Sequence, residues 1–280
     1  MGTNKERRES AMRSLEKEIK SRDRAEKTKP LGVVAAAAVA VLAIVGGIYW
    51  ANSSDDSAQT QASDQATPTT EESNFTPLAM KRAKALGDTV TCTYNDAGNA
   101  SKDVSKPKTE SVSAKGTTTV SLDTNKGKID LELDHAASPC TVNAIEHLAK
   151  QKYYDDTVCH RLTTSGIYVL QCGDPSGKGS GGPGFQFDNE YPTDEASDKQ
   201  TPVVYPRGSI AMANAGEGTN GSQFFLNYKD SPLPPAYTYF GKISDAGLKT
   251  LDKIAEAGVK DGGTDGTPAE KVKIMTAVVS

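Results

Sequence analysis

Hydrophobic and polar residues follow three different patterns along this chain of 280 residues. Residues 31–50 are uncharged and rich in Ala and Val, residues 51–76 offer almost nothing to bury, and regular alternation begins only at Gly116. A stretch that buries little apolar surface cannot offset the entropy of ordering, whereas alternation is typical of strands. The pattern therefore predicts an uncharged segment, a disordered linker and then a folded region.

The folded region, residues 116–280, contains short strand-like runs and two helical stretches. Alternation or short apolar runs between turn residues predict strands over 118–124, 128–133, 157–162, 168–172, 209–213, 223–227, 239–243 and 272–279. Apolar residues at helical spacing predict helices over 139–151, beginning at Ser138 as N-cap, and over 245–257, ending before Gly258. These elements predict a mainly β fold, a closed eight-stranded antiparallel β-barrel capped by two α-helices.

The stretch before this region, residues 77–115, has a weaker pattern. Val90–Tyr94 predicts a strand, and residues 95–108 are polar and turn-forming. We interpret residues 77–115 as an N-terminal extension that lies on the folded domain.

The distribution of charge changes the interpretation of the N-terminal third. Residues 1–30 carry ten Lys or Arg and six Asp or Glu, whereas residues 51–76 carry five acidic residues and no basic one. Twenty uncharged residues in a helix span about 30 Å, the thickness of a bilayer core. The basic excess before residues 31–50 predicts a cytoplasmic N-terminus. We therefore expect a charged cytoplasmic tail, a single-pass transmembrane anchor in the cell membrane, and an extracytoplasmic domain over residues 116–280.

A cleaved signal peptide is the alternative to an anchor. Its apolar region would be shorter, and Tyr49-Trp50-Ala51 is a poor cleavage site. The chain carries a net charge of −4, and the part beyond the linker is mildly acidic. That balance gives no reason to expect a nucleic-acid partner.

Two stretches carry a specific signal for function. In residues 208–228, two apolar runs flank a loop of Asn, Gly, Thr and Ser, and alternation places Gln223 and Phe225 on one face. A polar amide beside an aromatic ring suits a peptide-binding groove. The second stretch, residues 159–174, carries Arg161 and Gln171.

Both stretches resemble the signatures of the cyclophilins, the peptidyl-prolyl cis-trans isomerases, and the resemblance covers roughly residues 116–280. With its anchor, linker and four cysteines, the whole chain resembles the membrane-anchored cyclophilins of actinobacteria. The resemblance implies proline-containing polypeptides as partners, Arg161 and Gln171 as catalytic residues, and no metal or cofactor. It implies substrate-binding roles for Tyr168, Val169, Ala213, Asn214, Ala215, Gln223, Phe225, Leu233 and Tyr237. The segment between Arg161 and Gln171 is two residues longer than in the common form, and counting back from Gln171 gives Tyr168 as the aromatic pocket residue.

The chemistry of isomerisation matches these residue types. Rotation about an X–Pro bond breaks amide resonance, a barrier of about 18–20 kcal/mol, and makes or cuts no bond. A guanidinium at Arg161 can donate a hydrogen bond to the proline nitrogen more strongly in the twisted amide than in the planar one. Gln171 would orient that guanidinium, and the main chain of Asn214 would hold the substrate backbone. The alternative is a non-catalytic peptide-binding or chaperone module that uses the same groove.

Two further expectations concern disulfides and inhibitor binding. Four cysteines, Cys92, Cys140, Cys159 and Cys172, lie beyond the uncharged segment, and an even number in an exported domain predicts disulfides with three pairings open. Many cyclophilins carry a Trp beside the pocket that helps to hold cyclosporin. In the loop over residues 230–237 that position falls at Pro232 or Leu233. Neither side chain can donate a hydrogen bond, so the resemblance implies weak cyclosporin binding.

Overall fold

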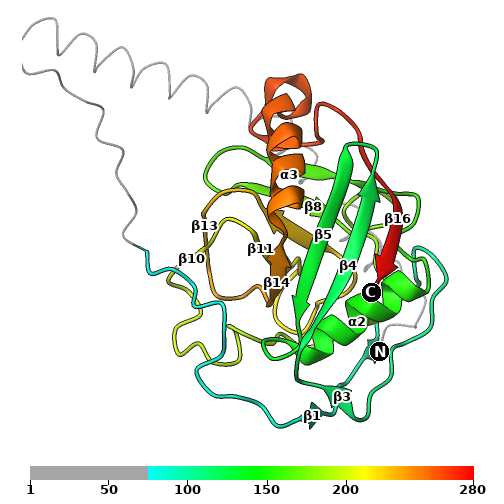
Figure 1. Cartoon of the computed structure of the whole chain (residues 1–280), viewed down its shortest axis with the longest axis vertical. Coiled ribbons are helices and arrows are strands. Elements are labelled where there is room, and N and C mark those ends of the chain that lie inside the picture. The colour runs from blue at the N-terminus through cyan, green and yellow to red at the C-terminus, as the bar shows by residue number, and fades with distance from the viewer. Residues whose placement is uncertain (1–74) are drawn as a thin grey trace, which may run out of the picture. The chain divides into compact units, whose positions relative to one another are not determined.

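The computed structural model describes residues 75–280 of the chain (Figure 1). The predicted tail, the predicted anchor at residues 31–50 and nearly all of the predicted linker lie outside the described residues. Among residues 75–280, no helix is both long enough and apolar enough to cross a membrane.

A ten-stranded sheet forms the frame of the domain. Its strands lie in the order β15 (Asp265–Gly266), β7 (Arg161–Thr163), β8 (Val169–Cys172), β12 (Phe224–Asn227), β11 (Ser209–Met212), β14 (Tyr239–Ile243), β5 (Gly127–Asp134), β4 (Thr117–Thr124), β16 (Val272–Val279) and β6 (Thr157–Cys159). Every neighbouring pair is antiparallel. With α2 (Pro139–Lys150) and α3 (Asp245–Ala257), this arrangement confirms the predicted mainly β fold with two helices.

The prediction of a closed eight-stranded barrel is wrong, because the hydrogen-bonded ladder ends at β15 and at β6. Residues 157–162, predicted as one strand, form two strands separated by His160 alone. The first, β6, pairs with β16 at one end of the sheet, and the second, β7, pairs with β8 near the other end. The chain thus passes between the two ends of the sheet, and the Cys159–Cys172 disulfide links β6 to β8 across them.

Three two-stranded sheets and a short 3-10 helix complete the described part. They are β1 (Thr89–Val90) with β3 (Val112–Ser113), β10 (Val203–Tyr205) with β13 (Ser231–Leu233), β2 (Asn95–Asp96) with β9 (Phe185–Gln186), and the 3-10 helix Lys260–Gly262. The predicted strand at Val90–Tyr94 is therefore wrong except at its first residue. Cys92 pairs its N–H with the carbonyl of Thr109 at 2.8 Å instead.

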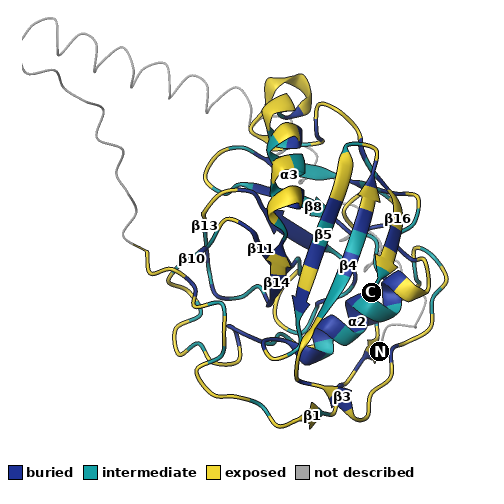
Figure 2. Ribbon diagram, in the orientation of Figure 1, coloured by how far each residue is buried: buried dark blue, intermediate teal, exposed yellow. Residues whose placement is uncertain are grey.

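Each helix covers the sheet with one apolar face (Figure 2). In α2, Val142, Ile145 and Leu148 are buried, and in α3, Leu251 and Ile254 are buried while the outer face is exposed. The spacing of these residues at intervals of three is the helical pattern seen in the sequence. Helix α3 lies along β5, and α2 lies near β16.

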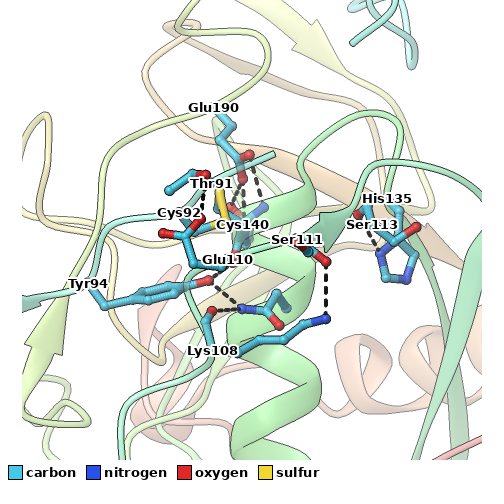
Figure 3. The surroundings of a disulfide bond; sticks show 12 residues. Thr91, Cys92, Tyr94, Lys108, Glu110, Ser111, Ser113, His135, Cys140 and Glu190 are labelled. Atoms are coloured by element: carbon cyan, nitrogen blue, oxygen red, sulfur yellow. Dashed lines mark hydrogen bonds between the residues drawn. A yellow bond between two sulfur atoms is a disulfide. The ribbon is translucent and has the colours of Figure 1, made fainter. Parts of the chain in front are cut away.

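The N-terminus of α2 is capped differently from the sequence prediction. Ser138 stands at the N-cap position, but its hydroxyl donates to the carbonyl of Tyr239 at 2.7 Å. The carboxylate of Glu190 instead accepts hydrogen bonds from the N–H groups of Cys140, at 3.0 Å, and Thr141, at 2.8 Å (Figure 3). Negative charge at this end of a helix is stabilised by the helix dipole.

A second disulfide, Cys92–Cys140, fastens residues 77–115 to α2 (Figure 3). Cys92, Tyr94 and Val112 belong to the same buried cluster as residues of the helices and the sheet. The hydroxyl of Tyr94 donates to the carbonyl of Cys140 at 2.7 Å. The extension therefore shares the domain's core, and the two disulfides select one of the three pairings that the sequence left open.

Candidate functional site

Three predicted residues lie in one row across three neighbouring strands. Arg161 on β7 pairs with Gln171 on β8, and Gln171 pairs with Phe225 on β12. Residues directly opposite each other in an antiparallel pair project to the same face of the sheet. The strand register, which joins residues distant in sequence, therefore brings Arg161, Gln171 and Phe225 together as predicted.

Arg161 is held by a carboxylate that the sequence analysis did not identify. Its Nε and Nη2 donate to the two carboxylate oxygens of Asp265, each at 2.7 Å. Asp265 stands 104 residues further along the chain on the two-residue strand β15, where nothing in the local sequence marks it. Hydrogen bonding between the two groups raises the pKa of Arg161 and lowers the pKa of Asp265.

This ion pair orients the guanidinium more than it stabilises the fold. The side chains of Arg161 and Asp265 are 40% and 52% exposed, and ion pairs exposed to that degree contribute little stability. Two forked hydrogen bonds nevertheless fix the guanidinium plane. A third N–H, on Nη1, approaches the amide oxygen of Gln171 at 3.4 Å. A guanidinium has five N–H donors, so two have no partner within residues 75–280 and can donate to a ligand.

The amide of Gln171 continues this arrangement through a second glutamine. Its Nε2 donates to Oε1 of Gln223 at 2.9 Å. Gln223 in turn donates to the carbonyls of Gly179 and Gly181, at 3.0 and 2.9 Å. Each amide is thereby fixed in orientation, with the oxygen of Gln171 facing Arg161.

A small cavity of about 150 Å³, lined by both apolar and polar side chains, opens beside Arg161. Its lining residues are Arg161, Ile167, Val169, Gln171, Ala213, Asn214, Phe225, Leu233 and Tyr237. Val169, Phe225 and Leu233 are buried and belong to a second hydrophobic cluster, separate from the main core. Engineered apolar cavities of about this volume hold benzene, so a five-membered ring fits here.

Tyr168 does not line this cavity, and Ile167 occupies the place predicted for it. Ile167, Val169 and Gln171 all line the cavity, whereas Tyr168 and Leu170 point to the other face. The ring of Tyr168 packs edge-on against Tyr228, with their centroids 6.0 Å apart. Strand alternation explains the correction, because adjacent residues such as Tyr168 and Val169 project to opposite faces.

A larger groove of about 500 Å³ continues from the cavity and shares Gln171, Ala213 and Asn214 with it. Ala215 and Gln223, predicted to line a neighbouring groove, are among its lining residues. Asn214 is held at the junction by its side chain, which donates to the carbonyl of Ala236 at 3.0 Å. Its main-chain N–H and C=O have no partner within residues 75–280, so both can pair with an extended peptide.

Comparison with known proteins identifies relatives of the folded part. The family model described as "Cyclophilin type peptidyl-prolyl cis-trans isomerase/CLD" matches residues 119–279. The "Probable peptidyl-prolyl cis-trans isomerase B" of Mycobacterium tuberculosis is 58% identical over 165 residues, which cover 57% of this chain and 54% of the relative. The protein of the same name from Mycobacterium leprae is 52% identical over 192 residues, which cover 66% and 65%.

A solved structure is also similar. The crystal structure of a cyclophilin type peptidyl-prolyl cis-trans isomerase from Cryptosporidium parvum has a TM-score of 0.49 and 31% sequence identity, and covers 59% of this chain and 98% of that chain. The matches to the two mycobacterial relatives span only about half to two thirds of those proteins.

Proposed function

This chain belongs to the cyclophilin-type peptidyl-prolyl cis-trans isomerase family, and we propose on that premise that it is a prolyl isomerase acting on proline-containing polypeptides. The observation that carries the proposal is the arrangement around the small cavity. Arg161 has unused N–H donors at its edge, and a ring-sized apolar space lies beside them. Catalysis of X–Pro rotation requires a cavity that holds the proline ring and a donor that stabilises the twisted amide.

In the proposed mechanism the proline ring occupies the cavity over Val169, Phe225 and Leu233. As the amide twists, its nitrogen loses resonance with the carbonyl and regains a lone pair. A free N–H of Arg161 donates to that nitrogen, and the bond is stronger in the twisted state than in the planar one. Asp265 fixes the guanidinium beforehand, so little reorganisation is needed when the amide twists.

Exchange NMR on an Ala-Pro peptide tests this proposal with the full-length chain. We expect the cis–trans exchange rate to increase in proportion to the amount of protein added. Peptide binding without any increase in the rate would instead support the alternative, a non-catalytic peptide-binding or chaperone module.

Substitutions at two adjacent positions test which residue lines the proline pocket. We expect Ile167→Ala to lower kcat/KM about tenfold, because it removes apolar surface from the cavity. Tyr168→Ala should leave kcat/KM within about twofold, since the ring packs against Tyr228 outside the cavity. A larger loss with Tyr168→Ala than with Ile167→Ala, measured on the same peptide, would show that Tyr168 is the pocket residue.

The proposal extends to location. We place the enzyme at the cell membrane through residues 31–50, with the N-terminus cytoplasmic and the isomerase domain outside, where it would act on exported proteins. The support is the uncharged run and the basic residues before it. Protease added to intact cells is expected to cleave residues 51–76 and release the domain. Cleavage that occurs only after lysis would show the opposite orientation, with the domain in the cytoplasm.

We also expect weak cyclosporin binding. Leu233 lines the cavity and Pro232 lies beside it on β13, and neither can donate a side-chain hydrogen bond. The chain's one Trp, Trp50, lies far away in the sequence, in the predicted anchor. Loss of one buried hydrogen bond costs about 1–3 kcal/mol, or about tenfold to a hundredfold in affinity. Titration with cyclosporin beside a Trp-bearing cyclophilin measures the difference, and equal affinities would refute the expectation.

A further inference from the structure

A segment of the N-terminal extension, residues 95–101, forms one wall of the larger groove. Ala97, Asn99 and Ser101 are among the groove's lining residues, together with Ala213 and Gln223. All three lie before residue 119, where the match to the family model begins. This wall therefore lies outside the part of the chain that the family model matches.

The segment is fixed against the glycine-rich stretch 179–186 by main-chain hydrogen bonds. Strand β2 pairs with β9, the N–H of Ala97 donates to the carbonyl of Gly184 at 2.9 Å, and that of Ser101 donates to the carbonyl of Gly182 at 2.8 Å. The Cys92–Cys140 disulfide anchors the chain a few residues before the segment. The wall is held at several points along its length.

Glycines on the facing stretch allow this close approach. A Cβ at Gly181 would lie 2.2 Å from the hydroxyl oxygen of Ser101, and one at Gly184 would lie 3.2 Å from the main-chain nitrogen of Ala100. Gly184 also has a positive φ of 79°. The glycines of residues 179–186 therefore leave room for the extension to pack closely against them.

Among residues 75–280, no charged side chain lines the groove. Its polar side chains are amides and hydroxyls, including those of Asn99, Ser101, Gln171, Gln186, Thr219 and Gln223. Two charges on the extension are engaged elsewhere. Asp96 pairs with Lys106 at 2.7 Å, and the ammonium of Lys102 donates to the carbonyl of Asp155 at 3.0 Å.

Asp174 is the carboxylate beneath the glycine-rich stretch, and it is fully buried. Its oxygens accept from the N–H groups of Ser176, Gly179 and Gly181, at 2.7, 2.8 and 2.9 Å. These hydrogen bonds compensate its charge. A charged side chain that entered the groove would lose water without gaining a counter-charge, which is costly.

We propose that residues 95–101 are a specificity wall, which selects substrates with an uncharged polar or small side chain flanking the proline. The inference rests on the proposed function for the position of the proline, because the groove and the proline cavity share Gln171, Ala213 and Asn214. A substrate backbone held at Asn214 sends a side chain near the proline into the groove. Asn99 is exposed on the wall and is the position from which charge preference can be changed.

The test introduces charge at Asn99 in the full-length chain. The peptides carry Gln, Glu or Lys in turn at each of the two positions before the proline and the two positions after it. For each peptide, kcat/KM and the Kd from NMR titration are measured. Wild type should prefer Gln over both charged residues at one position at least. At that position Asn99→Asp should raise the Lys-to-Glu ratio about threefold to tenfold, and Asn99→Lys should lower it similarly, as expected for charges a side chain apart in a partly exposed groove.

Thr93→Asp and Thr93→Lys are the matched controls, because Thr93 is exposed on the same extension but does not line the groove. They should leave the ratios unchanged. Unchanged ratios in both Asn99 variants, or equal changes in the Thr93 variants, would overturn the specificity wall. If wild type binds the peptides without isomerising them, the proposed function fails. The Lys-to-Glu ratios of Kd then still test whether the wall selects substrates. Absence of binding to every peptide would overturn both.

Discussion

Arg161→Ala should lower kcat/KM for an X–Pro peptide by at least tenfold while the domain remains folded. The side chain is 40% exposed and its ion pair with Asp265 is also exposed, so its loss costs little stability. The loss in rate has a separate cause. Among residues 75–280 the guanidinium is the one cationic donor that lines the ring-sized cavity, and in the proposed mechanism its hydrogen bond to the proline nitrogen strengthens only as the amide twists. Each tenfold in rate corresponds to about 1.36 kcal/mol of that differential stabilisation.

Arg207→Ala is the matched control. Arg207 makes a similar forked pair with Asp252, at 2.8 Å on both arms, and its side chain is 39% exposed. It does not line the cavity or the groove. Removal of this arginine should leave kcat/KM within about twofold, whereas a well-folded Arg161→Ala variant with the wild-type rate would refute the catalytic assignment.

Asp265→Asn tests whether Asp265 positions Arg161. It keeps one hydrogen-bond acceptor but loses the forked carboxylate, so the guanidinium is held less firmly. We expect an intermediate loss in kcat, with KM nearly unchanged, because Asp265 does not line the cavity. An effect confined to KM would argue that Asp265 contacts substrate rather than positioning Arg161.

Loss of the Cys92–Cys140 disulfide is expected to have the largest effect on stability. Its two cysteines are 48 residues apart, against 13 for Cys159–Cys172. In the chain-entropy account a crosslink stabilises by restricting the unfolded chain, typically by about 2–4 kcal/mol and more for longer loops. The double substitution Cys92→Ala with Cys140→Ala should therefore lower the free energy of unfolding by about 4 kcal/mol, measured by urea denaturation.

The double substitution Cys159→Ala with Cys172→Ala provides the comparison, with an expected loss about 1 kcal/mol smaller. Reduction of the wild-type chain should shift the urea midpoint further than either double substitution. An unchanged midpoint for the Cys92 and Cys140 variant would show that the core contacts of Tyr94 and Val112 hold the extension without the crosslink.

Local elements were determined by the sequence itself. The hairpin of β4 and β5, and helix α3, with Gly258 at its end, were predicted within a residue or two. Each depends on neighbours within a few positions, such as alternation, helical spacing and a glycine with positive φ. Such signals are complete within a short window of sequence.

The residues that meet at the candidate site could also be picked out from the sequence, because residues 159–174 and 208–228 resemble a known family. Arg161, Gln171 and Phe225 meet as predicted once the strands pair. The error at Tyr168 arose where the chain is two residues longer than the common form. Counting back from Gln171 placed the adjacent residues Tyr168 and Val169 together in the pocket. In the structure Ile167 and Val169 line the cavity, whereas Tyr168 projects to the other face.

Only the tertiary structure decided the contacts that join distant segments. Asp265 reaches Arg161 across 104 residues, Glu190 caps a helix about 50 residues before it, and the extension at residues 95–101 becomes a wall of the groove. The disulfide pairing and the open ends of the sheet belong to the same class. None of these has a local signal, because each depends on strand register and on how the curled sheet brings its ends together, which no short window of sequence contains.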